Sequence, residues 1–198
     1  LGTDARNLVY VQNVTIALNI VAHSLDLGAG DEVLTTNHEY GAIDKTWRFL
    51  SKERGFNYKA QQVDLTSHGN FVDSFWQGVG ENTRVIFMSH ITSPTATIFP
   101  IEEIIIRARE KGIITVIDGA HVAGQLPLNL DSLGADFYGG NLHKWLCAPK
   151  GSGFLYARPK MQHLLKPLVV SWGYESDRPS GSEFIDHHEW WGTRDVAA

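Results

Sequence analysis

The sequence lacks the features of secreted, membrane-spanning and nucleic-acid-binding proteins. Its single cysteine, Cys147, excludes an intramolecular disulfide and is typical of a reducing compartment. No apolar run is long enough to span a bilayer, and there is no signal-peptide pattern. The net charge is −5 and the basic residues are not clustered, whereas binding to a phosphate backbone requires clustered Lys and Arg. We therefore expect a cytoplasmic protein that binds neither membranes nor nucleic acid.

Glycine-rich motifs, internal repeats and linkers are also missing. No glycine-rich fingerprint follows the first predicted strand, which argues against a nucleotide-binding α/β domain. Hydrophobic residues make up 43% of the chain and charged residues 20%, as is ordinary for a globular protein. With 198 residues, the chain is long enough to form one α/β domain with a sizeable core.

Apolar, β-prone segments alternate with helical patterns along the chain. The clearest helix begins at Pro100 and ends before Gly112, because Ile101, Ile104 and Ile105 recur at helical spacing. Other helices are predicted at 13–25, 40–54 and 71–79, and strands at 8–11, 31–36, 56–63, 84–89, 113–118, 136–139 and 153–157. This order predicts a three-layer α/β/α fold with a mostly parallel sheet covered on both faces. Such sheets bind ligands at the carboxyl ends of their strands.

Two charged side chains stand at predicted strand ends. Asp118 closes an apolar strand, where an uncompensated carboxylate would be costly. Lys144 follows an apolar strand and two glycines, and apolar surroundings lower the pKa of a lysine amine. An aspartate and a lysine so placed are what an enzyme needs to hold pyridoxal phosphate (PLP). The amine forms a Schiff base with the aldehyde, and the carboxylate keeps the pyridine nitrogen protonated. Taken singly, each has a plainer alternative: Asp118 as a cap of the next turn, and Lys144 as a surface lysine.

The segments 116–121 (Val-Ile-Asp-Gly-Ala-His) and 139–145 (Gly-Gly-Asn-Leu-His-Lys-Trp) resemble those of fold type I PLP enzymes. The resemblance is to the class V aminotransferase branch, which includes cysteine desulfurases and isopenicillin N epimerases, and it covers essentially the whole chain. It implies that residues 1–198 form the PLP-binding large domain of such an enzyme. Because members of the family also carry an N-terminal segment and a C-terminal small domain, we expect this chain to be a fragment.

The resemblance also implies a set of cofactor-binding residues. Asn13-Val14-Thr15 opens a helix directly after a strand, where unpaired N–H groups and the helix dipole favour a phosphate, although Asn13 is also a good N-cap. His38 is expected to stack on the pyridine ring, its alternative being an exposed loop histidine. The implied set comprises the catalytic Lys144, Asp118 and His38, together with Asn13, Val14, Thr15, Thr95, His121, Asn141, His143, Gly192 and Thr193.

Several of these residues have implied partners. His121 resembles the position that bonds the phenolic oxygen of the cofactor, and Asn141 and His143 resemble ligands on the phosphate side. Gly192-Thr193 resembles a turn that reaches the phosphate of the neighbouring subunit. The adjacent tryptophans at 190 and 191 would form an apolar patch of the kind that marks interfaces. We therefore expect a homodimer.

Two other features invite a chemical interpretation that we do not favour. His187 and His188 are adjacent, so their side chains diverge, and no third ligand follows; we expect no metal site. Cys147 is similar in type to a persulfide-forming nucleophile, but it follows Lys144 on what should be a short packed segment. We expect this thiol to be buried and inert.

The sequence indicates the cofactor more clearly than it indicates the reaction. The wording His-Lys-Trp-Leu-Cys-Ala-Pro-Lys-Gly at 143–151 and Trp-Trp-Gly-Thr-Arg-Asp at 190–195 favours the isopenicillin N epimerase-like group, and Ala148 stands where desulfurases usually have glycine. The expected function is therefore PLP-dependent chemistry at the α carbon of an amino acid. Desulfurase, carbon–sulfur lyase and transaminase activities stay open. A non-catalytic domain that keeps the fold but lacks the substrate half is the alternative from another class.

Overall fold

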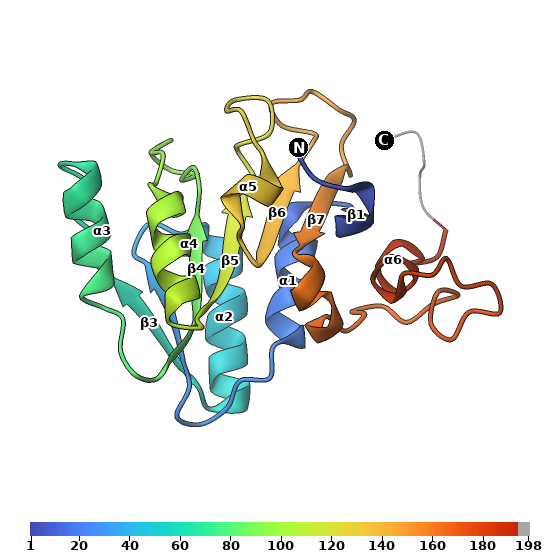
Figure 1. Cartoon of the computed structure of the whole chain (residues 1–198), viewed down its shortest axis with the longest axis horizontal. Helices are drawn as coiled ribbons and strands as arrows, with labels where there is room; N and C mark the ends of the chain where they lie inside the picture. Colours follow the sequence, from blue (N-terminus) through green and yellow to red (C-terminus); the bar gives the residue numbers. More distant parts are fainter. Residues whose placement is uncertain (194–198) are drawn as a thin grey trace.

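The computed structural model describes residues 1–193 and contains a seven-stranded sheet between two layers of helices (Figure 1). The strands are β1 Leu8–Val11, β2 Glu32–Thr36, β3 Asn57–Gln61, β4 Thr83–Ser89, β5 Ile114–Gly119, β6 Phe137–Asn141 and β7 Gly153–Ala157. The helices are α1 Val14–Ser24, α2 Gly41–Arg54, α3 His68–Trp76, α4 Ile101–Glu110, α5 Leu130–Leu133 and α6 Glu183–Glu189, with 3₁₀ turns η1 Ala5–Asn7 and η2 Pro159–Leu164. The predicted α/β class is confirmed.

The strand order places the ends of distant segments beside one another. The order is β1-β7-β6-β5-β4-β2-β3, and β7 runs antiparallel to both of its neighbours, β1 and β6. The other described pairs are parallel, so β1 to β6 all end at the same edge of the sheet. The predicted, mostly parallel sheet is therefore confirmed, and six strands end at one edge.

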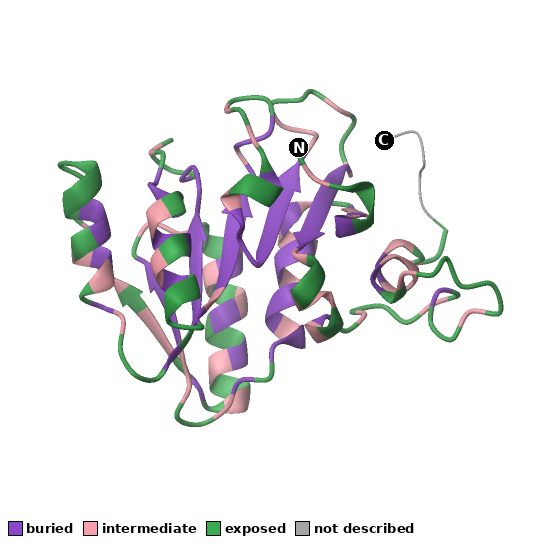
Figure 2. Cartoon of the chain, in the orientation of Figure 1, coloured by how far each residue is buried: buried purple, intermediate pink, exposed green. Residues whose placement is uncertain are grey.

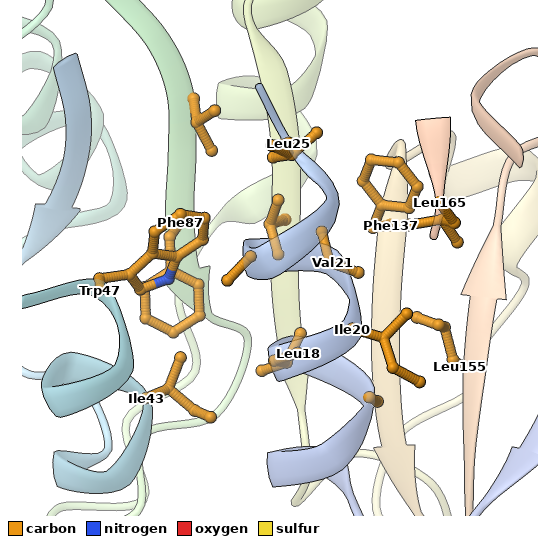
Figure 3. Packing of buried hydrophobic residues seen from close by; sticks show 14 of the residues in the cluster. Leu18, Ile20, Val21, Leu25, Ile43, Trp47, Phe87, Phe137, Leu155 and Leu165 are labelled. Carbon is orange, nitrogen blue, oxygen red and sulfur yellow. The ribbon is translucent and has the colours of Figure 1, made fainter. Parts of the chain in front are cut away.

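Two separate hydrophobic cores hold the layers together. Figure 2 shows that the central strands between the helices are buried. Successive side chains of a strand point to opposite faces. In β4, Val85 and Phe87 accordingly join the core under α1 and α2, whereas Ile86 and Met88 join the core under α3 and α4. On the first face, the Trp47 ring of α2 packs 6.1 Å from the Phe87 ring, centroid to centroid (Figure 3).

Helix α1 lies close against the sheet because of glycine in β6. A Cβ atom added at Gly139 would lie 3.3 Å from Val14 Cγ1 and 3.4 Å from Ala17 Cβ. A larger residue at this position would therefore push α1 outward. The close packing brings the first turn of α1 to the end of β6, where the predicted lysine follows.

The local differences from the predicted elements are small, apart from the cysteine. The helix expected at 71–79 starts at His68, because Ser67 caps it by accepting the N–H of Asn70. The short helices α5 and α6 were not predicted, since four and seven residues carry too little periodicity. The expectation that Cys147 is buried was wrong. It is exposed, with φ 56°, because it lies in the segment between β6 and β7, where residues 145–147 are all exposed.

Among the described residues, no helix combines the length and the apolar character that crossing a bilayer requires.

Candidate active site

A cavity of about 160 Å³ opens where the strands end. It is lined by residues at or shortly after the ends of β1, β2, β4, β5 and β6, namely Asn13, Val14, Thr15, Tyr40, Ser89, Ile91, Ser93, Asp118, Ala120, His121, Asn141, His143 and Lys144. The fold therefore gathers most of the predicted site residues around one space, although they are far apart in the sequence. A larger hollow of about 810 Å³ lies between η1, η2 and α6, and no predicted site residue lines it.

Four predicted residues do not line this cavity. The His38 ring lies edge-on to the Phe99 ring, with 6.1 Å between centroids. Thr95 sits in an exposed turn, where its hydroxyl bonds the hydroxyl of Thr92 at 2.7 Å. Gly192 and Thr193 are exposed and line a different hollow, of about 310 Å³, beside the start of α1.

Asp118 forms the most deeply buried charged wall of the cavity. It is 3% exposed, it ends β5 between Ser89 of β4 and Gly139 of β6, and its Oδ1 accepts the N–H of Ala120 at 2.9 Å. Burial raises its pKa to about 6, against the opposing effects of the Ala120 N–H and the positive charge of Lys144. A cationic N–H group placed beside this carboxyl would offset the free-energy cost of burying its charged form.

Lys144 and His121 both line the cavity and contact each other. Its Nζ lies 2.9 Å from His121 Nε2, and the other ring nitrogen, Nδ1, accepts the indole N–H of Trp145 at 3.2 Å. Burial lowers the pKa of the lysine amine, while the charge of Asp118 acts in the opposite direction. Burial and the charge of Lys144 both lower the pKa of His121. The pair therefore favours the neutral, nucleophilic amine.

The first turn of α1 closes the opposite side of the cavity. Asn13 caps the helix by accepting the N–H of Ile16 at 3.0 Å, and Asn141 Oδ1 accepts the N–H of Val14 at 2.9 Å. Next to it, His143 Nδ1 donates to the carbonyl oxygen of Ser152 at 2.7 Å, because a carbonyl only accepts. The positive end of the helix dipole at Thr15 gives this side the character of an anion site.

Glu39, which was not among the predicted site residues, stands behind the cavity wall. Its Oε2 accepts both the N–H and the hydroxyl of Ser89, at 2.8 and 2.6 Å, and its Oε1 accepts the hydroxyl of Thr36 at 2.5 Å. Burial, aided by the charge of Asp118 and opposed by these hydrogen bonds, raises its pKa to about 7. Its position directly after the buried strand β2 was the signal in the sequence that could have identified it.

Within residues 1–193, no group of three or more His, Cys, Asp or Glu side chains is arranged to hold a metal ion.

Comparison with known proteins gives similarities at three levels. The aminotransferase class-V family profile matches residues 1–183. The chain is 39% identical over 183 residues to isopenicillin N epimerase of Streptomyces clavuligerus, covering 91% of this chain and 46% of that protein. It is 33% identical over 168 residues to a probable cysteine desulfurase of Vibrio cholerae, covering 83% and 41%. The chain thus spans less than half the length of these two relatives.

The structural similarity is to PLP enzymes that act on sulfur compounds. The cystine C–S lyase C-DES, in complex with its product cysteine persulfide, superimposes with a TM-score of 0.86 at 28% identity, over 96% of this chain and 53% of that one. A lysine-to-alanine mutant of C-DES, with glycine covalently linked to its PLP cofactor, gives a TM-score of 0.83 at 28% identity, over 92% and 51%. Together with the match of the family profile over residues 1–183, these similarities show that the chain belongs to the aminotransferase class V family, as the sequence motifs predicted.

Proposed function

We propose that the chain is the cofactor-binding domain of a PLP-dependent enzyme that acts at the α carbon of an amino acid. One observation carries the proposal. Asp118, Lys144 and the first turn of α1 line the same cavity, Asp118 is buried, and burial lowers the pKa of the Lys144 amine. These groups match the pyridine nitrogen, the aldehyde and the phosphate of PLP in chemical type. When bound, PLP supplies an electron sink that stabilises negative charge at the α carbon.

We assign each side chain the task that its surroundings favour. Lys144 Nζ binds the cofactor covalently and carries a proton, because its lowered pKa suits it to both. Asp118 holds the pyridine nitrogen in its protonated form. His121 donates to the phenolic oxygen, and the phosphate lies against the first turn of α1 and the segment after β6. The roles of His38, Thr95, Gly192 and Thr193 stay predictions that rest on the resemblance.

The proposed reaction is of the isopenicillin N epimerase type. Two isopenicillin N epimerases are 39% and 35% identical to this chain, above the 33% of the probable cysteine desulfurase of Vibrio cholerae. The structural similarity to a cystine C–S lyase supports a second candidate, cleavage of a carbon–sulfur bond. Both begin with labilisation of a bond at or next to the same carbon, so this domain alone does not separate them.

We further propose a cytoplasmic homodimer. Trp190 is 59% exposed, and large exposed aromatic side chains of this kind are enriched at interfaces. Because Gly192 and Thr193 are exposed and lie outside this chain's own cavity, they are accessible to a second copy. Light scattering of the full-length protein tests this point, and a monomer at high concentration with full cofactor occupancy contradicts it.

Isotope exchange tests the proposed reaction. In deuterium oxide, the full-length protein with PLP should replace the α hydrogen of its amino-acid substrate by deuterium. Racemised product supports the epimerase, and release of pyruvate or alanine with sulfur supports the carbon–sulfur lyase or desulfurase. A protein that binds PLP but exchanges no amino acid contradicts the enzymatic proposal and leaves the non-catalytic domain.

A further inference from the structure

We infer that Trp145 is a positioning residue whose indole N–H fixes the tautomer of His121, and that His121 in turn holds the Lys144 amine in its neutral form before the cofactor arrives. The inference rests on the proposed covalent role of Lys144. It concerns the chain's own hydrogen bonds in the cofactor-free state, so it has consequences that are measurable without catalysis.

The first step follows from the donor and acceptor inventory of the three side chains. An indole N–H is a donor only, so His121 Nδ1 must accept the 3.2 Å bond from Trp145. A neutral imidazole has a single N–H, which must then lie on Nε2. Burial and the neighbouring lysine lower the pKa of His121, so the neutral ring prevails near pH 7. Trp145 therefore selects one of the two tautomers.

The second step concerns the lysine. His121 Nε2–H points to Lys144 Nζ, 2.9 Å away. An ammonium has three hydrogens and no lone pair, so it cannot accept this bond, whereas a neutral amine can. The selected tautomer therefore stabilises the form of Lys144 that attacks an aldehyde. The other tautomer would accept from an ammonium and stabilise the unreactive form.

The third step is the path of the chain that brings the indole to the ring. Gly124 has φ 93°, and a Cβ added there would lie 2.7 Å from the backbone carbonyl carbon and oxygen of Trp145. The segment after β6 thus rests directly on the turn after β5, which carries His121. Gln125 stiffens that turn by donating to the carbonyl oxygen of His121 at 2.6 Å. The indole is 53% exposed and does not line the cavity, so it acts through His121.

Other titratable groups surround the same amine. The charge of Asp118 raises the pKa of Lys144, and it also raises the pKa of Glu39 behind the cavity wall. His143 and Tyr40 also line the space. Trp145→Phe keeps all of these groups and an aromatic ring but removes the indole N–H, so it is the sharpest variant. Trp172→Phe, the same change at a residue that is 82% exposed, is the matched control.

The test measures the His121 tautomer and the pH profile of cofactor capture in the full-length protein. In the wild type, ¹⁵N NMR of histidine-labelled, cofactor-free protein should show His121 protonated on Nε2. In Trp145→Phe, part of that population should move to Nδ1. Cofactor capture, followed by visible absorbance, should be slower at pH 7 by about tenfold for each unit by which the amine pKa rises, and equal to the wild type at high pH. Trp172→Phe should match the wild type throughout.

Two results would overturn the inference. One is a wild-type His121 protonated on Nδ1, which needs no variant and no cofactor. The other is a folded Trp145→Phe protein with an unchanged tautomer and an unchanged pH profile. A failure of the proposed function is recognised separately, because the wild type would then capture no PLP at any pH whatever the tautomer of His121.

Discussion

The side-chain oxygen of Asn141 accepts the backbone N–H of Val14 at 2.9 Å and so joins the end of β6 to the first turn of α1. Both residues line the candidate active site, on the side that we propose for the phosphate. The bond engages one of the N–H groups at the helix N-terminus and leaves the side-chain NH₂ of Asn141 as a donor. Asn141 therefore orients the helix that we propose to face the phosphate, as well as lining the site itself.

Substitutions at Asn141 should separate these two contributions. Asn141→Asp keeps the acceptor for the Val14 N–H, so we expect near-normal stability. It also adds a negative charge that repels the phosphate. A repulsion of about 1.4 kcal/mol corresponds to about tenfold weaker PLP binding, and we expect at least this effect. Asn141→Ala removes the bond to a buried N–H and should cost about 1–3 kcal/mol of stability. Urea unfolding and fluorescence titration with PLP measure the two effects. Equal PLP affinity in Asn141→Asp and the wild type would argue against a phosphate on this side.

Lys144 should be the site of covalent attachment. Treatment of the PLP-loaded protein with borohydride should fix the cofactor, and peptide mapping should find it on Lys144. Lys144→Arg keeps a positive charge but cannot form the bond, so it should yield no fixed label. Lys150→Arg, at a residue of the same loop that does not line the cavity, is the control and should label normally. Label on another lysine in the wild type would contradict the assignment.

Asp118 should matter for reactivity more than for binding. Asp118→Asn is nearly the same size but carries no charge, so it cannot hold a pyridine nitrogen in its protonated form. With the phosphate contacts intact, PLP should still bind, while α-hydrogen exchange should slow by on the order of 10²–10³-fold, the usual effect of losing one electrostatic contact in an active site. Deuterium incorporation followed by NMR measures this rate. Near-normal exchange would mean that the carboxylate is only a cap of the following turn.

Glu39 should make the cofactor-free protein less stable as the pH rises. Its pKa is raised from an ordinary 4.5 to about 7 in the folded state, so the folded protein holds the proton more tightly than the unfolded chain. The resulting stability is fully present below pH 4.5 and is lost as the pH rises through 7, by on the order of 2–3 kcal/mol. Asp118, with a pKa of about 6, contributes in the same direction.

Glu39→Gln isolates this effect, because the amide resembles the protonated acid. We expect the variant to lose much less stability between pH 4.5 and 7.5 than the wild type, with the Asp118 contribution remaining. Urea unfolding at a series of pH values measures the difference. Glu53→Gln, at an exposed position of α2, should retain the wild-type dependence. Parallel curves for the wild type and Glu39→Gln would show that Glu39 does not hold its proton in this range.

Local patterns were sufficient to predict the layers of the fold. Two of these patterns are properties of short segments and can be recognised without a structure. They are the helical spacing of Ile101, Ile104 and Ile105 and the apolar strand that leads to Asp118. Once a mostly parallel sheet is predicted, residues that follow strands must meet at one edge. This topological rule is why Asp118 and Lys144 could be placed in one site.

The tertiary structure alone decided which of these residues touch and how they titrate. The ring of His38 turns to Phe99, Cys147 is exposed, and Glu39 lies behind the cavity wall. The position of Glu39 after a strand could have marked it, but where each of these three side chains lies depends on strand register and on the path of a loop. The contact of Trp145 with His121 likewise requires the segment after β6 to rest on Gly124 of the turn after β5. Hydrogen-bond direction and desolvation act over a few ångströms, and only the packed chain sets those distances.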